Sequence, residues 1–248
     1  MNRTTLLLAA LTLTATAAQA QTMLAPRTFP LVIDQPGHYK LSASLTVPAL
    51  THGIKITASN VVLDLNGFTV KGPGFCGTYC PGAGQASGIW INAGNVTVRN
   101  GTVQGFDYAG VFFANFQTTL EDLNVTENFH AGIYRHSPPA NLKADTMPAT
   151  LRRVMAVRNG RMGVNGYGMT IENSTLAQNF GSGMFSQGYN FISETRFVHN
   201  QTYGFEHQMN AVLNDGMRGS RFVGNGSQPT IQSMPLSAGD NVANTTVF

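Results

Sequence analysis

Side chains that could transfer protons gather in the middle of the sequence. Tyr134 and His136 lie close together and His130 comes just before them, while Arg161 follows later in the chain. Abstracting the C5 proton of a uronate sugar needs a cation to hold the carboxylate, a general base and a general acid. Arg161 or Arg135 could be that cation. His130 or His136 could be the base, with Tyr134 as the acid. The same residues could equally be exposed polar side chains at turns.

The composition excludes several classes of protein. The chain has 248 residues, of which 11% are charged, and its formal net charge is +3. A charged share below the usual value of about 25% argues against a coiled coil or a long solvated helix. The small net charge argues against a nucleic-acid binder. The chain contains 27 Gly residues and is rich in Asn, Thr and Val, which favours strands and turns.

The first 20 residues have the pattern of a secretory signal peptide. Arg3 precedes an apolar run from Leu6 to Ala17, and Ala18-Gln19-Ala20 follows as a small-x-small cleavage site. We therefore expect residues 21–248 to be secreted or periplasmic, with no membrane span after cleavage. The alternative is that the segment stays on the chain as an N-terminal anchor.

The two cysteines, Cys76 and Cys80, lie in one Gly- and Pro-rich loop. In an oxidising compartment a local disulfide between them is the favoured interpretation. A zinc site would need further ligands, and the loop offers none.

A glycine followed by an apolar residue recurs along the chain. Without two insertions, at about 72–86 and 137–147, the period is about 20–22 residues. The pairs are Gly53-Ile54, Gly88-Ile89, Gly110-Val111, Gly132-Ile133, Gly163-Val164, Gly183-Met184 and Gly204-Phe205. Such a short unit cannot bury its own apolar side chains, so successive units must stack.

An asparagine column keeps register with that glycine. The column contains Asn128, Asn159, Asn179, Asn200 and Asn225. Asparagine suits bends because it tolerates the left-handed conformation and because its amide can bond the equivalent amide one coil away. Two further apolar columns predict three short strands in each coil and leave no room for a helix.

The repeat resembles the right-handed parallel β-helix repeats of the pectate-lyase-like superfamily over about residues 30–245, most clearly at 53–68 and 95–101. This resemblance implies an all-β, single-stranded right-handed parallel β-helix (a solenoid) of about seven to eight coils with short end caps. The mature chain would be one domain, with an N-terminal cap at 21–50, coils at 53–226 and a C-terminal cap at 227–248. The superfamily includes pectate lyases, polygalacturonases, alginate lyases, epimerases and proteins without known activity, so the fold does not fix the function.

In enzymes of that superfamily the cleft runs along the strand that follows the glycine. Period-two alternation makes the apolar residue after each glycine point inward and the next one outward. The outward row then reads Lys55, Trp90, Phe112, Tyr134, Asn165, Phe185 and Glu206, and a second row, two positions on, reads Thr57, Asn92, Ala114, His136, Tyr167, Gln187 and Gln208. An exposed aromatic row indicates a partner, and a sugar chain suits one. The alternative is that the insertions fold over these rings.

Carboxylates suited to glycoside hydrolysis or to calcium binding do not fall on that row. No adjacent Asp pair occurs, Asp64 and Asp122 fall on other predicted strands, and Glu206 stands alone in the row. Neither a cofactor nor a metal site is expected.

Two functions remain open. The first is a secreted protein that binds a polysaccharide or a cell-surface glycan along Trp90, Phe112, Tyr134 and Phe185, without a complete catalytic set. The second is a polysaccharide lyase or C5-epimerase acting on an acidic glycan, with Tyr134, His136, His130 and Arg161 at its centre. The sequence does not decide whether the protein is an enzyme, nor its oligomeric state.

Overall fold

The computed structural model describes residues 21–247 except 26–27, 75–84, 115–116, 137–148, 209–214, 227–230, 233–235, 238, 240 and 244–245. The expected signal peptide at 1–20 and the disulfide between Cys76 and Cys80 lie outside the described residues, as do most of the two insertions.

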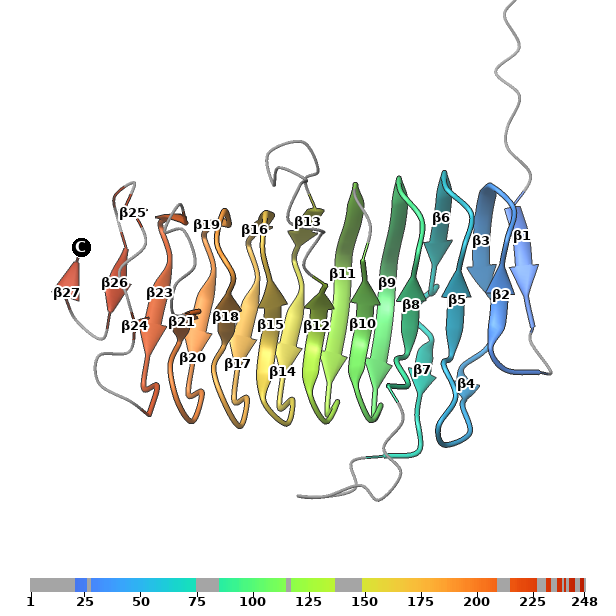
Figure 1. Cartoon of the computed structure of the whole chain (residues 1–248), viewed down its shortest axis with the longest axis horizontal. Coiled ribbons are helices and arrows are strands. Elements are labelled where there is room, and N and C mark those ends of the chain that lie inside the picture. Colours follow the sequence, from blue (N-terminus) through green and yellow to red (C-terminus); the bar gives the residue numbers. More distant parts are fainter. Residues whose placement is uncertain are drawn as a thin grey trace, which may run out of the picture.

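All regular secondary structure in the described residues is β-strand. These residues include no helix long and apolar enough to cross a membrane. Figure 1 shows the coils stacked side by side along one axis, with the first coils at one end and the last at the other. One nine-stranded sheet receives one strand from each coil. Its strands are β2 (Leu31–Ile33), β5 (Ile54–Ile56), β8 (Ile89–Ile91), β10 (Ala109–Phe113), β12 (Ala131–Arg135), β15 (Met162–Gly166), β18 (Met184–Ser186), β21 (Phe205–His207) and β24 (Ile231–Gln232).

A second, 18-stranded sheet forms the rest of the wall, and most coils add two strands to it. Its strands are β1 (Gln21–Leu24), β3 (Gly37–Leu41), β4 (Leu45–Thr46), β6 (Val61–Asp64), β7 (Thr69–Lys71), β9 (Val96–Gln104), β11 (Thr118–Thr126), β13 (Ala149–Arg152), β14 (Met155–Val157), β16 (Met169–Glu172), β17 (Thr175–Ala177), β19 (Phe191–Ser193), β20 (Arg196–Val198), β22 (Gly216–Arg218), β23 (Arg221–Val223), β25 (Leu236–Ser237), β26 (Val242–Ala243) and β27 (Thr246–Val247). Successive coils pair in parallel, so the chain is a parallel β-helix, as the repeat predicts.

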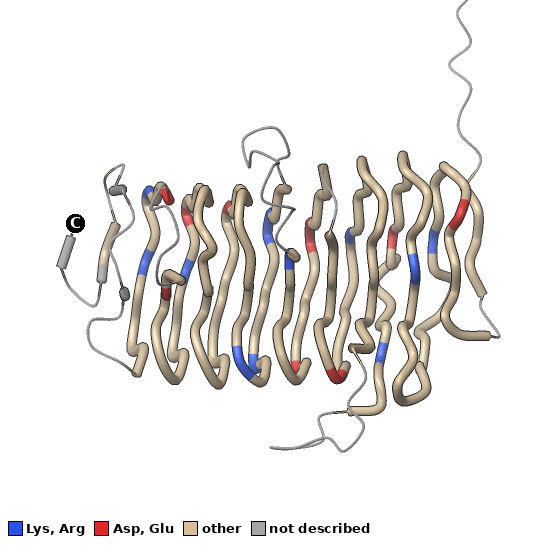
Figure 2. The backbone as a smooth tube through the Cα atoms, in the orientation of Figure 1, with Lys and Arg blue, Asp and Glu red and all other residues tan. Residues whose placement is uncertain are grey.

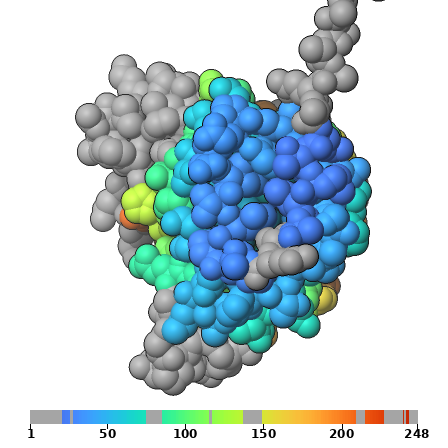
Figure 3. Space-filling model, turned by 90° about the vertical axis from the view of Figure 1, so that its right-hand side faces the viewer, coloured from blue at the N-terminus to red at the C-terminus, as the bar shows by residue number. Residues whose placement is uncertain are grey.

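The two ends of the stack are built differently. Within 21–50, β2, β3 and β4 pair in parallel with β5, β6 and β7, and β1 adds one more strand beside β3. The space-filling view from this end shows described residues of the first coils facing the viewer (Figure 3). At the other end β26 and β27 form an antiparallel pair.

The core is the inside of the coil, and its columns are the predicted ones. The residue after each repeat glycine is fully buried, from Ile54 to Phe205, and packs in register on its neighbours. The two other apolar columns, represented by Leu176 and Ile192, are buried as well. Stacking therefore hides the side chains that a single coil would leave exposed.

The asparagine column forms a continuous hydrogen-bonded ladder inside the coil. The Asn179 side-chain oxygen accepts from the Asn159 backbone N–H at 3.0 Å and from its side-chain amide at 3.1 Å. The Asn179 amide donates to the Ala156 carbonyl at 3.1 Å and to the next side-chain oxygen, that of Asn200, at 2.9 Å. The same pattern links all five members, as predicted: Asn128, Asn159, Asn179, Asn200 and Asn225.

One part of that prediction is wrong, because none of the five asparagines is left-handed. The left-handed residue is the one before each of them, with φ of 57° at Glu127, 52° at Arg158 and 54° at Gln178. This conformation costs about 1–2 kcal/mol for a residue with a side chain. It is tolerated here because it turns the following amide inward, where the ladder satisfies it.

The repeat glycine is needed for close approach. A Cβ built at Gly163 would lie 2.6 Å from the Gly183 carbonyl oxygen and 2.8 Å from the Asn179 side-chain nitrogen. The glycine column and the asparagine column are therefore parts of one packing arrangement.

Asn179→Ala is expected to lower the free energy of unfolding by about 3 kcal/mol or more, since it removes four buried hydrogen bonds that the Asn179 side chain makes to Asn159, Ala156 and Asn200. Denaturant unfolding followed by circular dichroism measures this. The matched control is Asn173→Gly, at an exposed left-handed position with φ of 49°, which should change stability by about 0.5 kcal/mol or less. Equal effects of the two substitutions would contradict a structural role for the ladder.

Candidate functional site

The outward row on the nine-stranded sheet has the predicted register. Strand pairing aligns Lys55 with Trp90, Trp90 with Phe112, and Phe112 with Tyr134. The row continues through Asn165 and Phe185 to Glu206. We call this surface, defined by Lys55, Trp90, Phe112, Tyr134, Asn165, Phe185 and Glu206, the aromatic face. Its rings are half-buried, whereas Asn165 is nearly buried at 5% exposure.

A cluster of rings lies at the centre of the aromatic face. It consists of Tyr108, Phe112, His130, Tyr134 and His136. Tyr134 contacts all the others, with ring centroids 5.5 Å from Tyr108 and 5.6 Å from Phe112. The cluster is thus a contiguous patch of rings from two successive coils, rather than a set of isolated aromatic residues.

Trp90 lies next to this cluster in the row and has an ammonium group and an imidazole as neighbours. The Lys55 ammonium lies 4.8 Å from the Trp90 ring centroid, within the range of a cation–π contact. The His52 ring centroid lies 5.9 Å from that of Trp90. Burial lowers the pKa of His52, and the nearby Lys55 lowers it further.

The turn before each of these strands aligns Tyr108, His130 and Arg161 in one column. The His130 backbone N–H donates to the Tyr108 carbonyl at 3.0 Å, and the residue after Arg161 donates to the His130 carbonyl at 3.2 Å. Burial lowers the pKa of His130, with a further contribution from Arg161. Burial, together with Tyr134, raises the pKa of Tyr108 to about 12. At neutral pH the column therefore presents an uncharged imidazole, a protonated phenol and a guanidinium.

Arg135 is not on this face, so its expected role as the carboxylate-binding cation is wrong. It is 1% exposed, and its guanidinium donates to the carbonyl of Tyr167 at 2.9 Å and to that of Gly168. The guanidinium also lies 4.6 Å from the Tyr167 ring centroid. Period-two alternation already points Arg135 inward, since it follows the outward Tyr134.

Tyr167 does not point outward, so its predicted place in the second outward row is wrong. Its ring is 6% exposed and packs on Arg135. Gly166, with φ of 154°, and Gly168, with φ of 57°, flank it and bend the chain there, so strand alternation no longer applies. The other described members of that row are exposed or half-buried, and His136 is exposed beside the ring cluster.

A cavity of about 290 Å³ opens at the C-terminal part of the aromatic face. It is lined by Arg161, Met162, Gly181, Ser182, Phe185, Thr202 and Glu206. The Ser182 hydroxyl hydrogen-bonds the Glu206 carboxylate and lies 2.8 Å from the Thr202 hydroxyl. Sequence reasoning missed Ser182 and Thr202. Their position in the turn just before each repeat glycine was the available signal.

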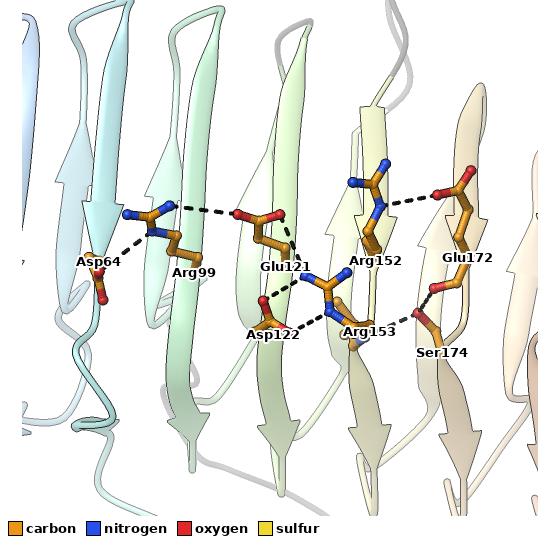
Figure 4. A network of polar contacts seen from close by, with 9 residues as sticks. Asp64, Arg99, Glu121, Asp122, Arg152, Arg153, Glu172 and Ser174 are labelled. Carbon is orange, nitrogen blue, oxygen red and sulfur yellow. Dashed lines mark hydrogen bonds and ion pairs between the residues drawn. The ribbon is translucent and has the colours of Figure 1, made fainter.

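The carboxylates Asp64 and Asp122 belong to the other sheet, as predicted. Figure 4 shows the network there, in which Arg153 contacts Asp122 at 2.6 Å and Glu121 at 3.9 Å, and Arg99 contacts Asp64 at 3.5 Å. Charged residues are otherwise spread thinly over the coils (Figure 2). No group of three His, Cys, Asp or Glu that could hold a metal ion occurs within the described ranges.

A buried serine, aspartate and histidine near the C-terminal coils do not form a nucleophilic site. Asp215 Oδ2 accepts from the Ser186 hydroxyl at 2.6 Å, and His207 Nε2 lies 3.2 Å from the same oxygen. The aspartate lies between the other two, so His207 cannot take the Ser186 proton. Asp215 Oδ1 instead accepts from the Asn190 backbone N–H at 2.7 Å. This bond joins two neighbouring coils, as the bonds of the asparagine ladder do.

The lowered pKa of His130 predicts how stability changes with pH. Below its ordinary value of 6.5 the unfolded chain takes up a proton that the folded protein resists, so the free energy of unfolding should fall as pH drops below 6.5. His130→Gln should reduce this slope without removing it, because the pKa of His52 is lowered too. Melting temperatures from pH 7.5 to 5.5 and NMR titration of His130 measure this. An imidazole titrating at or above pH 6.5 would contradict it.

Comparison with known proteins identifies the architecture. A family model for the right-handed β-helix region matches residues 87–246. Pectate lyase Pel9A superposes with a TM-score of 0.63 at 14% identity, over 92% of this chain and 67% of the lyase. The Dettilon tailspike protein gives 0.43 at 13% identity, over 89% of this chain and 62% of its own. Tailspike protein 2 of bacteriophage CBA120 gives 0.45 at 14% identity, over 86% of this chain and 42% of its own.

No curated protein sequence matches the chain. At these low identities the structural similarity concerns the fold alone. The family match covers more than half of the chain and coincides with the stacked parallel coils seen in the structure. The chain belongs to the right-handed parallel β-helix family and has a pectate-lyase-like fold.

Proposed function

We propose that this protein binds a glycan chain along the aromatic face. The observation that carries the proposal is the alignment of Trp90, Phe112 and Tyr134 in the outward position of three successive strands. Adjacent strands are about 4.8 Å apart. The row therefore offers a straight series of apolar platforms on which an extended chain of rings can lie.

The chemistry around the rings suits sugars better than an apolar partner. Sugar rings present C–H faces that stack on aromatic side chains, and hydroxyl groups that need polar partners at the edges. His136 and Asn92 are exposed beside the rings and Gln187 is half-buried there. The similarity to a pectate lyase supports the proposal only as a fold that also serves a protein acting on a polysaccharide.

The proposal includes export. Residues 1–20 have the features of a signal peptide, and a polymeric glycan partner would be met in the periplasm or outside the cell. Mass spectrometry of the protein from its native host, with a mature N-terminus at Gln21, would support export. A full-length N-terminus would count against it.

Trp90→Ala and Tyr134→Ala should each weaken glycan binding about tenfold or more, because truncating an aromatic anchor costs about 1.4 kcal/mol or more. A glycan array on residues 21–248 identifies the ligand, and calorimetry with that ligand measures the loss. Phe191→Ala is the matched control, since Phe191 is an exposed ring, at 43%, on the other sheet. Equal effects of all three substitutions, or no glycan bound at all, would reject the proposal.

Catalysis on an acidic glycan is a second candidate, favoured by the Tyr108, His130 and Arg161 column beside Tyr134. The lowered pKa of His130 keeps a neutral base available at neutral pH, and Tyr134 could act as the acid. Arg161 could hold the carboxylate of a uronate sugar. His136 lies next to Tyr134 and offers a second imidazole.

If the protein is a lyase, it should release unsaturated products from polygalacturonate or alginate. Ultraviolet absorbance measures the formation of these products. Tyr134→Phe and His130→Gln should abolish the signal, while His199→Gln, at an exposed bend of the other sheet, should leave it unchanged. Because an epimerase makes no unsaturated end, NMR of the treated polymer completes the test. Unchanged polymer in both measurements leaves binding as the function.

A further inference from the structure

The cavity beside Phe185 differs in chemistry from the ring cluster. The ring cluster offers aromatic and imidazole surfaces, whereas the cavity combines one aromatic ring, one cation and one carboxylate. Phe185 and Glu206 belong to the outward row itself, in successive strands. The cavity is therefore a continuation of the aromatic face, and its volume of about 290 Å³ is close to the lower limit of about 300 Å³ for ligand pockets.

The polar groups of the cavity are complementary to a hydroxyl group. The Arg161 guanidinium can only donate hydrogen bonds, and an ionised Glu206 can only accept them. A sugar hydroxyl does both, so one pair of neighbouring hydroxyls could satisfy the two side chains together. A carboxylate on the sugar could accept from Arg161, but it would also be repelled by Glu206.

Hydroxyl groups that line the cavity hold the carboxylate of Glu206 in place. Ser182 is 1% exposed, hydrogen-bonds the carboxylate, and is itself within 2.8 Å of the Thr202 hydroxyl. These two hydroxyls come from adjacent turns, so the backbone fixes their positions. A preorganised acceptor of this kind gives selectivity because a ligand that fails to match gains no hydrogen bond from a group already fixed in position.

We infer that this cavity binds one uncharged pyranose ring of the glycan, stacked on Phe185 with neighbouring hydroxyls between Arg161 and Glu206. The inference rests on the proposed glycan binding and adds the charge class of one sugar unit. Phe112 and Phe185 are three strands apart in the row, or about 14 Å. The bound glycan thus spans both the ring cluster and the cavity.

The test compares oligogalacturonate with its methyl ester, which removes the charge and adds one methyl group per sugar unit, together with neutral manno-, xylo- and cello-oligosaccharides. Calorimetry on residues 21–248 should give tighter binding of at least one neutral oligosaccharide than of oligogalacturonate. Glu206→Gln keeps the shape but removes the charge. This substitution should lower the affinity for the neutral oligosaccharide about tenfold. It should also reduce the preference for the methyl ester over the free acid. Glu194→Gln, an exposed carboxylate on the other sheet, should change neither.

The outcomes separate the two proposals. If Trp90→Ala weakens binding but Glu206→Gln acts like Glu194→Gln, glycan binding stands and the cavity inference is wrong. If wild type prefers oligogalacturonate to its methyl ester, the inference is also wrong, and a uronate held by Arg161 is favoured. If none of the probes nor any glycan on the array binds, both proposals fail together.

Discussion

Hydrogen bonding between one coil and the next is the interaction on which the whole molecule depends. A coil of 20–22 residues has no interior of its own, so its apolar columns are buried only when the neighbouring coils stack in register. Parallel backbone pairing provides most of this contact, and the asparagine ladder adds a side-chain column within the wall. Each ladder amide bonds both the backbone and the side chain of its neighbour, as at Asn159 and Asn179. A shift of one residue would break these bonds.

The same register makes the two outer surfaces chemically different. On the second sheet the outward positions hold arginines and carboxylates that pair across coils, as between Arg152 and Glu172 at 3.1 Å. Exposed pairs of this kind contribute about 0–1 kcal/mol each. On the nine-stranded sheet four of the seven positions of the aromatic face hold rings, which are not needed to neutralise a neighbouring charge. Neither core packing nor charge pairing requires rings on the aromatic face. We therefore propose a binding role for this surface.

Period and column arguments were enough to predict the parallel coils, the inward columns and the outward row, because each depends on a repeated position. Most of the features that were missed occur only once. Arg135 lies inside the coil because alternation continues past Tyr134, and its neighbour Tyr167 turned inward because two glycines bend that coil. The contact between Ser182 and Glu206 joins residues 24 apart in sequence, and the repeat marks the turn that holds Ser182 but not this pairing. The left-handed residues before each ladder asparagine were unexpected because their types, such as Glu127 and Arg158, do not favour that conformation.

Trp90 gives the most direct test that the outward row meets solvent and ligand, because it is the only tryptophan among 248 residues. Acrylamide quenching of its fluorescence reports whether the ring can be reached in the free protein and after a glycan is added. We expect acrylamide to quench the Trp90 fluorescence in the free protein and to quench it less when an oligosaccharide is bound. A ring that acrylamide cannot reach in the free protein, or one whose quenching no glycan changes, would contradict it.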